Sequence, residues 1–219
     1  MTYKEILKQY WGYDDFRGIQ KEIIESIGNG HDTLGLMPTG GGKSITFQVP
    51  ALAQPGLCLV ITPLIALMKD QVRNLRDRGI KALAVYSGMT REEIIVALEN
   101  CIFGDYKFLY ISPERLDTEI FRSKLRNMKV SMITVDESHC ISQWGQDFRP
   151  SYLKILDFLA ELPERPLVSA FTATATAEVR DDIVQALGLH EPFIKTTGFD
   201  RPNLYFAVEQ PTSKGMKLL

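Results

Sequence analysis

The sequence has few cysteines and no long apolar run. Its three cysteines, Cys58, Cys101 and Cys140, lie far apart and form no CxxC pair, which argues against a disulfide framework or a structural zinc site. We expect all three to be reduced core residues. No stretch of about 18 apolar residues is present, and the charged amino terminus lacks the apolar region of a signal peptide. We therefore expect an intracellular, reducing compartment and no membrane partner.

The chain also lacks an excess of either charge. Lysine and arginine total 25 against 27 acids, a net charge of −2, which excludes a histone-like polycation but not a local basic groove. The 219 residues are 45% hydrophobic and 24% charged, as in ordinary globular proteins with one sizeable core. This length is typical of one large domain or two small ones, and no repeat or low-complexity linker separates them.

Short apolar runs, several of them apolar on both faces, alternate with segments of helical periodicity. The expected strands are residues 33–37, 57–62, 82–86, 108–112, 132–136, 167–172 and 193–196. The expected helical faces and caps are Leu64, Leu67, Met68, Val72 and Leu75, stopped near Gly79; Thr90 with Glu93; and Val179, Ile183 and Leu187, stopped at Gly188. This alternation predicts an α/β fold with a doubly wound, mainly parallel sheet and helices on both faces.

The clearest motif is Met-Pro-Thr-Gly-Gly-Gly-Lys-Ser at residues 37–44, between a strand and a helical stretch. Its glycines let backbone N–H groups converge on phosphate oxygens at a helix N-terminus. Lys43 is expected to reach the β- and γ-phosphates of a nucleoside triphosphate, and the Ser44 hydroxyl to ligate Mg²⁺. The generic P-loop has Gly where this chain has Met37, and a glycine-rich surface turn is the structural alternative. The expected nucleotide contacts in the loop are Thr39, Gly40, Gly41, Gly42, Lys43 and Ser44.

Two adjacent acids, Asp136 and Glu137, follow another apolar run. At the carboxyl edge of a parallel sheet they would lie beside the P-loop, where ligands bind in open α/β folds. We expect Asp136 to hold Mg²⁺, directly or through water, and Glu137 to polarise the water that attacks the γ-phosphate. The structural alternative is an acid pair in a turn after a strand.

The segment 139–152, after these acids, mixes aromatic with polar side chains. Bases can stack on Trp144 and Phe148, at about 1–3 kcal/mol each, and Arg149 can contact phosphate. The structural alternative is that the aromatic rings fill the core beneath the loop.

Together these motifs resemble the first motor domain of superfamily 2 helicases, and in their details the RecQ family of DNA helicases. The motifs that carry the resemblance are Phe16-Arg17-Gly-Ile-Gln20, the 37–44 spelling including Met37, and the stretches 62–71, 112–115, 139–152 and 169–176. One departure is visible, because the acid box reads Asp-Glu-Ser-His where Asp-Glu-Ala-His is usual. Ser138 is small enough to be tolerated and can alter the hydrogen bonding near Glu137.

The resemblance implies a RecA-like P-loop NTPase domain that uses ATP and Mg²⁺. It implies that Arg17 and Gln20 contact the adenine edge, and that His139 bridges the γ-phosphate region to Gln143 or to a second motor lobe. The implied catalytic residues are Lys43, Asp136, Glu137 and His139. The implied DNA-coupling residues are Gln143, Trp144, Phe148, Arg149, Thr172 and Thr174, with Gly88 and Arg115 as weaker DNA-contact candidates by motif position. Apart from the resemblance, Lys69 and Arg73 are basic residues near a predicted helix end and are weaker candidates for contact with DNA phosphates.

The resemblance also implies a domain plan. Residues 1–208 are expected to form the helicase ATP-binding domain, and the polar residues 209–219 a connector toward a second RecA-like lobe, reached through Asp-Arg-Pro-Asn at 200–203. The implied partners are single-stranded and duplex DNA and that missing lobe. The implied activity of the full protein is ATP-driven 3′→5′ unwinding in recombination and repair. We expect this lobe alone to hydrolyse ATP very slowly and not to unwind DNA. The implied location is the cytoplasm, in association with the nucleoid, if the protein is bacterial, and the nucleus if it is eukaryotic.

Three other functions fit parts of the pattern. An RNA helicase shares the expected fold, but its acid box and its counterpart of the 169–176 motif normally read differently from the Asp-Glu-Ser-His and Thr-Ala-Thr found here. A nucleotide-gated interaction module agrees with the missing lobe and predicts partner binding without ATP turnover. A small-molecule P-loop kinase requires a lid segment and a second substrate motif, and neither is recognisable in the sequence.

Overall fold

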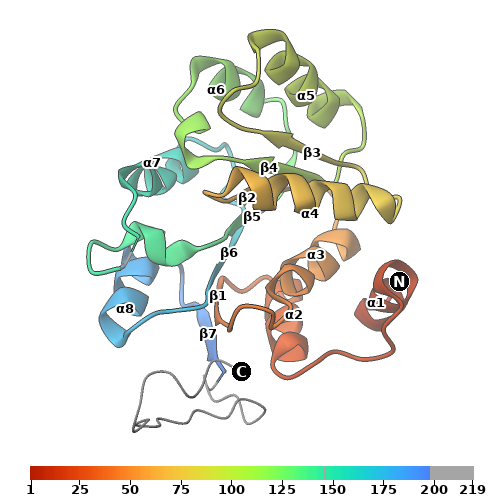
Figure 1. The fold of residues 1–219 in the computed structure, drawn as a ribbon, viewed down its shortest axis with the longest axis vertical. Helices are drawn as coiled ribbons and strands as arrows, with labels where there is room; N and C mark the ends of the chain where they lie inside the picture. Colours follow the sequence, from red (N-terminus) through yellow and green to blue (C-terminus); the bar gives the residue numbers. More distant parts are fainter. Residues whose placement is uncertain (146, 198–219) are drawn as a thin grey trace, which may run out of the picture.

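The computed structural model describes residues 1–145 and 147–197, which form a seven-stranded sheet in the order β3-β4-β2-β5-β6-β1-β7 (Figure 1). Every described strand pair is parallel. The strands are β1 (Thr33–Leu36), β2 (Leu57–Ile61), β3 (Ala82–Val85), β4 (Phe108–Ile111), β5 (Val130–Val135), β6 (Leu167–Thr172) and β7 (Phe193–Thr196). The predicted doubly wound α/β class is confirmed, and each strand lies within two residues of its predicted bounds.

Helices cover both faces of this sheet, because most strands are apolar on both sides. The helices are α1 (Tyr3–Trp11), α2 (Gln20–Gly28), α3 (Lys43–Ala53), α4 (Ile65–Asp77), α5 (Arg91–Phe103), α6 (Glu119–Leu125), α7 (Lys154–Ala160) and α8 (Ala177–Ala186). Along β2, Leu59 packs in the core layer beneath α5, α6, α7 and α8, and Val60 in the layer beneath α2, α3 and α4. Helix α1 lies outside α2 and α3 (Figure 1).

The helix boundaries follow local capping chemistry. Thr90 and Glu93 form the predicted capping box at the start of α5. A second capping box, Thr2 with Glu5, begins α1, a helix that the sequence analysis did not identify although the same signal is present. The expectation for Leu64 was wrong, because its side chain is 47% exposed. Leu64 is the extended N-cap residue of α4 and therefore lies outside the buried helical face.

The strand order determines where the motifs meet. Strand β6 lies between β1 and β5, and all three are parallel. Their carboxyl ends therefore share one edge of the sheet, where the loop after β1, the acid box after β5 and the Thr172 end of β6 come together. This is the edge at which open α/β folds bind ligands.

The opposite edge is held by a buried carboxylate. Asp32 precedes β1 and pairs with Arg165, with a shortest oxygen–nitrogen distance of 2.6 Å. It also accepts hydrogen bonds from the backbone N–H groups of Val168 and His190. One side chain thereby joins the starts of β1 and β6 to the turn after α8 at the edge away from the site.

The remaining structural expectations concern cysteines, membrane spans and the domain plan. All three cysteines are free and buried, as predicted. No helix within residues 1–145 and 147–197 combines the length and apolarity required to cross a bilayer. The expected connector 209–219, the stretch 200–203 and the last part of the predicted domain 1–208 lie outside the described residues.

Candidate nucleotide-binding site and its link to the aromatic loop

The loop after β1 has a backbone that only glycine adopts readily. Gly40 and Gly42 have φ values of +79° and +75°, in the left-handed region. At Gly42 a Cβ atom would also lie 2.2 Å from Gln20 Nε2, so a larger residue there would displace the Gln20 amide from the loop. The next residue, Lys43, begins α3, so Lys43 and Ser44 lie at the helix N-terminus. This arrangement fits a phosphate-binding loop, as the motif predicted.

Gln20 holds this loop against the start of α2. Its Nε2 donates to the carbonyls of Gly41 and Gly42 at 3.3 Å, and its Oε1 accepts from the Arg17 backbone N–H at 2.8 Å. A cavity of about 370 Å³ opens beside them, lined by residues that include Tyr13 and Arg17. The Arg17 guanidinium lies 5.2 Å from the centre of the Tyr13 ring. The structure thus brings both predicted adenine-contact residues to one cavity next to the loop.

The acid box places two carboxylates opposite Lys43. Lys43 Nζ lies 3.4 Å from Glu137 Oε1, and both side chains are mostly buried. Glu137 has φ +48° and ψ +43°, a left-handed conformation that costs a non-glycine residue of the order of 1–3 kcal/mol. Such strain concentrates at functional sites, where the surrounding structure holds it in place. Asp136 carries the second carboxylate and accepts the Glu137 backbone N–H at 3.0 Å.

The electrostatics of this pair favour cation binding. Burial, followed by the neighbouring negative charge of Glu137, raises the pKa of Asp136 to about 6, although the Lys43 ammonium opposes the shift. The positive charge of Lys43 is therefore too small to offset the burial of the Asp136 carboxylate and its repulsion from Glu137. The Ser44 hydroxyl and the Asp136 carboxylate are also the hard oxygen donors that Mg²⁺ prefers. The residues present fit the predicted metal ligands.

His139 joins the acid box to the end of β6. Its Nδ1 lies 2.8 Å from Thr172 Oγ1 and 3.3 Å from Glu137 Oε2. Thr172 Oγ1 in turn contacts the backbone of Thr174, accepting from its N–H at 3.2 Å. The predicted bridge from His139 to Gln143 is not found among the hydrogen bonds of the described residues, because the imidazole points to β6 instead. Lys43, Glu137, His139, Thr172 and Thr174 therefore form one continuous chain of contacts.

The unusual serine of the acid box adds a second connection to β6. Ser138 is fully buried, and its hydroxyl donates to the Phe171 carbonyl at 3.1 Å. An alanine at this position has no group that makes this bond. The expected change in hydrogen bonding near Glu137 is confirmed, and its partner is the carbonyl next to Thr172.

The aromatic segment separates into a buried and an exposed part. Tyr152 is fully buried, and its hydroxyl donates to the Asp136 carbonyl at 3.0 Å, so the structural alternative holds for this ring. Trp144 is 76% exposed and does not fill the core, while Phe148 is half-buried. The Arg149 guanidinium is held by Asp147 at 3.0 Å, and Gln143 is exposed. An exposed indole on a loop tied to the acid box is the arrangement that base stacking requires.

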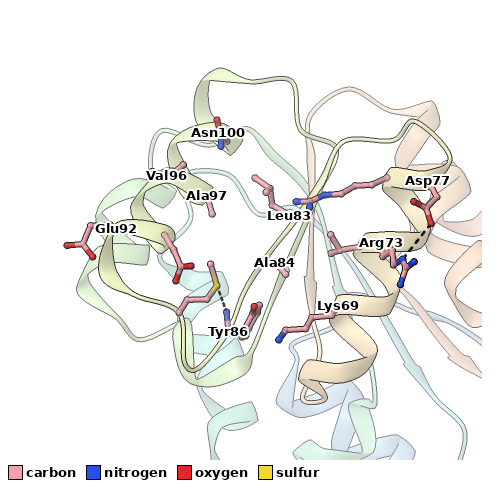
Figure 2. A pocket seen from close by; sticks show the side chains of 14 residues that line it. Lys69, Arg73, Asp77, Leu83, Ala84, Tyr86, Glu92, Val96, Ala97 and Asn100 are labelled. Atoms are coloured by element: carbon pink, nitrogen blue, oxygen red, sulfur yellow. Dashed lines mark hydrogen bonds and ion pairs between the residues drawn. The ribbon is translucent and has the colours of Figure 1, made fainter.

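The weaker DNA candidates Lys69 and Arg73 lie elsewhere. They line a groove of about 700 Å³ between α4, the edge strand β3 and α5 (Figure 2). Lys69 Nζ lies 4.5 Å from the centre of the Tyr86 ring, and Arg73 pairs with Asp77 at 4.0 Å. Figure 2 shows Lys69 pointing across the groove toward Tyr86. These two residues are not part of the nucleotide site.

Two contributors to the site, Tyr13 and Asp147, were missed, and the contact that Tyr152 makes with the acid box was not predicted. Tyr13 lines the cavity beside Arg17, and aromatic residues near the 16–20 motif were the only signal for it. Tyr152 supports the Asp136 backbone, and Asp147 holds Arg149 and contacts Cys140. Neither role had a signal in the sequence, because both depend on how the segment folds back onto the acid box.

Comparison with known proteins gives one family. The model of the DEAD/DEAH box helicase family matches residues 17–183. The chain is 45% identical over 212 residues to the ATP-dependent DNA helicase RecQ of Bacillus subtilis, covering 96% of this chain and 36% of the relative. It is 40% identical to the probable ATP-dependent DNA helicase RecS of the same organism, covering 98% of this chain and 43% of the relative. The chain thus spans well under half the length of these relatives.

Solved structures agree on the fold. The DUF1998 helicase MrfA, bound to DNA and AMPPNP, aligns with a TM-score of 0.70 at 18% identity, covering 90% of this chain and 28% of that one. A hypothetical ATP-dependent RNA helicase from Sulfolobus tokodaii aligns with a TM-score of 0.67 at 20% identity, covering 88% of this chain and 56% of that one. Both likenesses support the same overall fold for this chain.

The raised pKa of Asp136 predicts a pH-dependent stability. Its folded-state pKa of about 6 lies above the unfolded value of about 3.9, so the metal-free protein loses stability as pH rises from about 4 to about 6. Asp136→Asn removes this loss. We expect the variant to be more stable than wild type by about 1–3 kcal/mol at pH 7 and the difference to shrink toward pH 4, measured by urea unfolding without divalent metal.

The exposed Asp181→Asn serves as the control for this prediction, and it is expected to change stability little at either pH. A difference between Asp136→Asn and wild type that is equal at pH 4 and pH 7 would contradict the assignment.

The Ser138 hydrogen bond predicts a stability loss on restoring the usual alanine. Ser138→Ala leaves the Phe171 carbonyl unpaired in a buried position, which costs about 1–3 kcal/mol. Urea unfolding of this variant is compared with Ser123→Ala, whose hydroxyl bonds a carbonyl at an exposed position and whose loss should cost less than about 0.5 kcal/mol. Equal effects of the two substitutions would show that the Ser138 bond adds nothing.

Proposed function

Because the chain belongs to the DEAD/DEAH box helicase family, we propose that it is the first, ATP-binding motor lobe of a DNA helicase of the RecQ type. The observation that carries the proposal is the contact chain from Lys43 through Glu137 and His139 to Thr172. It joins the phosphate-binding loop to Thr172, which the resemblance assigns to the coupling with DNA.

The residues of the loop and acid box divide the work of ATP hydrolysis. Lys43 leaves Glu137 and pairs with the β- and γ-phosphates, which frees the Glu137 carboxylate to polarise the attacking water. Ser44 and Asp136 would hold Mg²⁺, which would supply positive charge to the phosphate oxygens. Gln20 and Arg17 receive the adenine edge. The Gln20 amide then exchanges bonds with the loop for bonds with the base, so base binding is felt at Gly41 and Gly42.

His139 reports the state of Glu137 to β6. When the water or the γ-phosphate changes the position of the Glu137 carboxylate, the imidazole contact changes with it and passes the change to Thr172 and Thr174. The exposed Trp144 and half-buried Phe148 stack on bases of single-stranded DNA, and Arg149 contacts phosphate after exchanging its bond with Asp147. DNA binding at Trp144 and Phe148 and ATP hydrolysis at Glu137 thereby act on the same segment of the chain, the acid box and the residues that follow it.

The whole protein extends beyond this lobe. Residues 1–208 form its ATP-binding domain, and residues 209–219 lead to a second RecA-like lobe that supplies an arginine to the γ-phosphate. The full protein unwinds duplex DNA in the 3′→5′ direction in recombination and repair. It works in the cytoplasm on the nucleoid in a bacterium, or in the nucleus of a eukaryote. The isolated lobe binds ATP with Mg²⁺ and does not unwind DNA.

ATP turnover with and without single-stranded DNA tests this proposal, on this chain and on a longer chain with a second motor lobe. Only the longer chain is expected to show DNA-stimulated turnover. Lys43→Ala abolishes turnover in both conditions because the phosphates lose their cation. Trp144→Ala retains the DNA-free rate and weakens DNA stimulation, with DNA affinity falling about 5- to 150-fold, the equivalent of about 1–3 kcal/mol per stacked base.

Exposed Phe103→Ala is the matched control for loss of an aromatic ring, since Phe103 is 83% exposed on α5 and away from the acid box. If the longer chain binds ATP and DNA but never turns ATP over, the chain is a nucleotide-gated module. If single-stranded RNA of the same sequence stimulates turnover better than DNA, the substrate assignment is wrong.

A further inference from the structure

Three potential metal ligands converge between the acid box and the aromatic loop. His139 Nε2 lies 3.9 Å from Cys140 Sγ, and Cys140 Sγ lies 3.8 Å from Asp147 Oδ2. One ligand atom from each residue falls within 4.8 Å of the other two. A tetrahedral ion with bonds of about 2.0–2.3 Å separates its ligand atoms by about 3.5 Å, so small side-chain movements bring all three to one ion.

We propose that His139, Cys140 and Asp147 form a binding site for a borderline-soft divalent cation of the Zn²⁺ type, with solvent as the fourth ligand. One nitrogen, one sulfur and one carboxylate oxygen are a donor set that suits this class of cation better than Mg²⁺ or Ca²⁺, which prefer oxygen ligands alone. The site is separate from the Mg²⁺ ligands Ser44 and Asp136.

The surroundings of His139 support ligation through Nε2. Its other ring nitrogen, Nδ1, contacts Thr172 Oγ1 at 2.8 Å and faces Glu137 Oε2 at 3.3 Å. Hydrogen bonds at one imidazole nitrogen fix the ring and leave the other for the metal, and a carboxylate partner raises its basicity. These contacts aim Nε2 at Cys140 before any ion binds.

Burial and charge also fit a cation here. Cys140 is fully buried, whereas the Asp147 side chain is 55% exposed and gives the ion a path from solvent. When the ion binds, the Cys140 thiol proton leaves to solvent, so one thiolate and one carboxylate balance the double positive charge. The Asp147 oxygen that faces Cys140 also accepts from Arg149, and the carboxylate retains a second oxygen for that guanidinium.

Such an ion would restrain the coupling apparatus, a consequence that rests on the proposed function. It would connect Asp147, which lies beside the aromatic residues Trp144 and Phe148, to His139 and Cys140 at the end of the acid box. The loop then loses freedom to move relative to Glu137 when DNA binds. We expect Zn²⁺ to lower DNA-stimulated ATP turnover while leaving ATP binding intact.

Cobalt absorption tests the site directly, because Co²⁺ replaces Zn²⁺ and a thiolate ligand gives a near-ultraviolet charge-transfer band with visible bands of a tetrahedral ion. The whole chain, titrated with Co²⁺ without nucleotide or DNA, is expected to develop these bands at one equivalent and to lose them on adding Zn²⁺. Cys140→Ser removes the bands, and Cys101→Ser, at another buried cysteine, retains them. Asp147→Asn, at an exposed position, weakens Co²⁺ binding at least about 10-fold.

Two outcomes overturn the site: no charge-transfer band at saturating Co²⁺, or a band that persists in Cys140→Ser. The regulatory consequence is measured separately, as the Zn²⁺ sensitivity of DNA-stimulated turnover in the longer chain, which should fall in Asp147→Asn. Co²⁺ binding with unchanged turnover would refute that consequence. Turnover that DNA never stimulates would refute the proposed function and leave the cobalt result standing.

Discussion

The parallel packing of β5, β6 and β1 is the constraint on which the site depends. Because β6 lies between the other two, its end at Thr172 separates the phosphate-binding loop from the acid box and touches both. The Met37 N–H donates to the Thr172 carbonyl at 3.0 Å, and His139 reaches the Thr172 hydroxyl. Both neighbours therefore contact the same residue of β6.

The acid box combines repulsion between two neighbouring carboxylates with a strained backbone. The Lys43 ammonium pairs with Glu137, the Asp136 carboxylate lies next to that of Glu137, and Glu137 occupies the left-handed region of backbone space. Hydrogen bonds around the turn offset this cost: Ser138 to the Phe171 carbonyl and Tyr152 to the Asp136 carbonyl. Additional positive charge from Mg²⁺ would remove the repulsion between Asp136 and Glu137, which makes the turn sensitive to the state of the nucleotide.

The sequence predicted the fold and the chemical groups of the site but not their mutual contacts. Apolar periodicity and glycine patterning are local signals, so the strands, the capping box at Thr90 and the loop at 37–44 were found to within a few residues. The contact of His139 with Thr172 was not predicted, because an imidazole reaches Thr172 only after β5 and β6 pair across the intervening chain. The prediction that Leu64 lies on the buried helical face was wrong for a related reason, since the start of α4 depends on the turn that precedes it.

The coupling of the ATP site to β6 through His139 is tested most directly by a double-mutant cycle on DNA-stimulated ATP turnover. The longer chain is measured as wild type, His139→Ala, Thr172→Val and the double variant, in which the valine retains the shape of Thr172. Direct contact predicts that the two effects are not additive, with an interaction free energy of at least about 0.5 kcal/mol. Effects that add to within about 0.3 kcal/mol would contradict transmission through this contact.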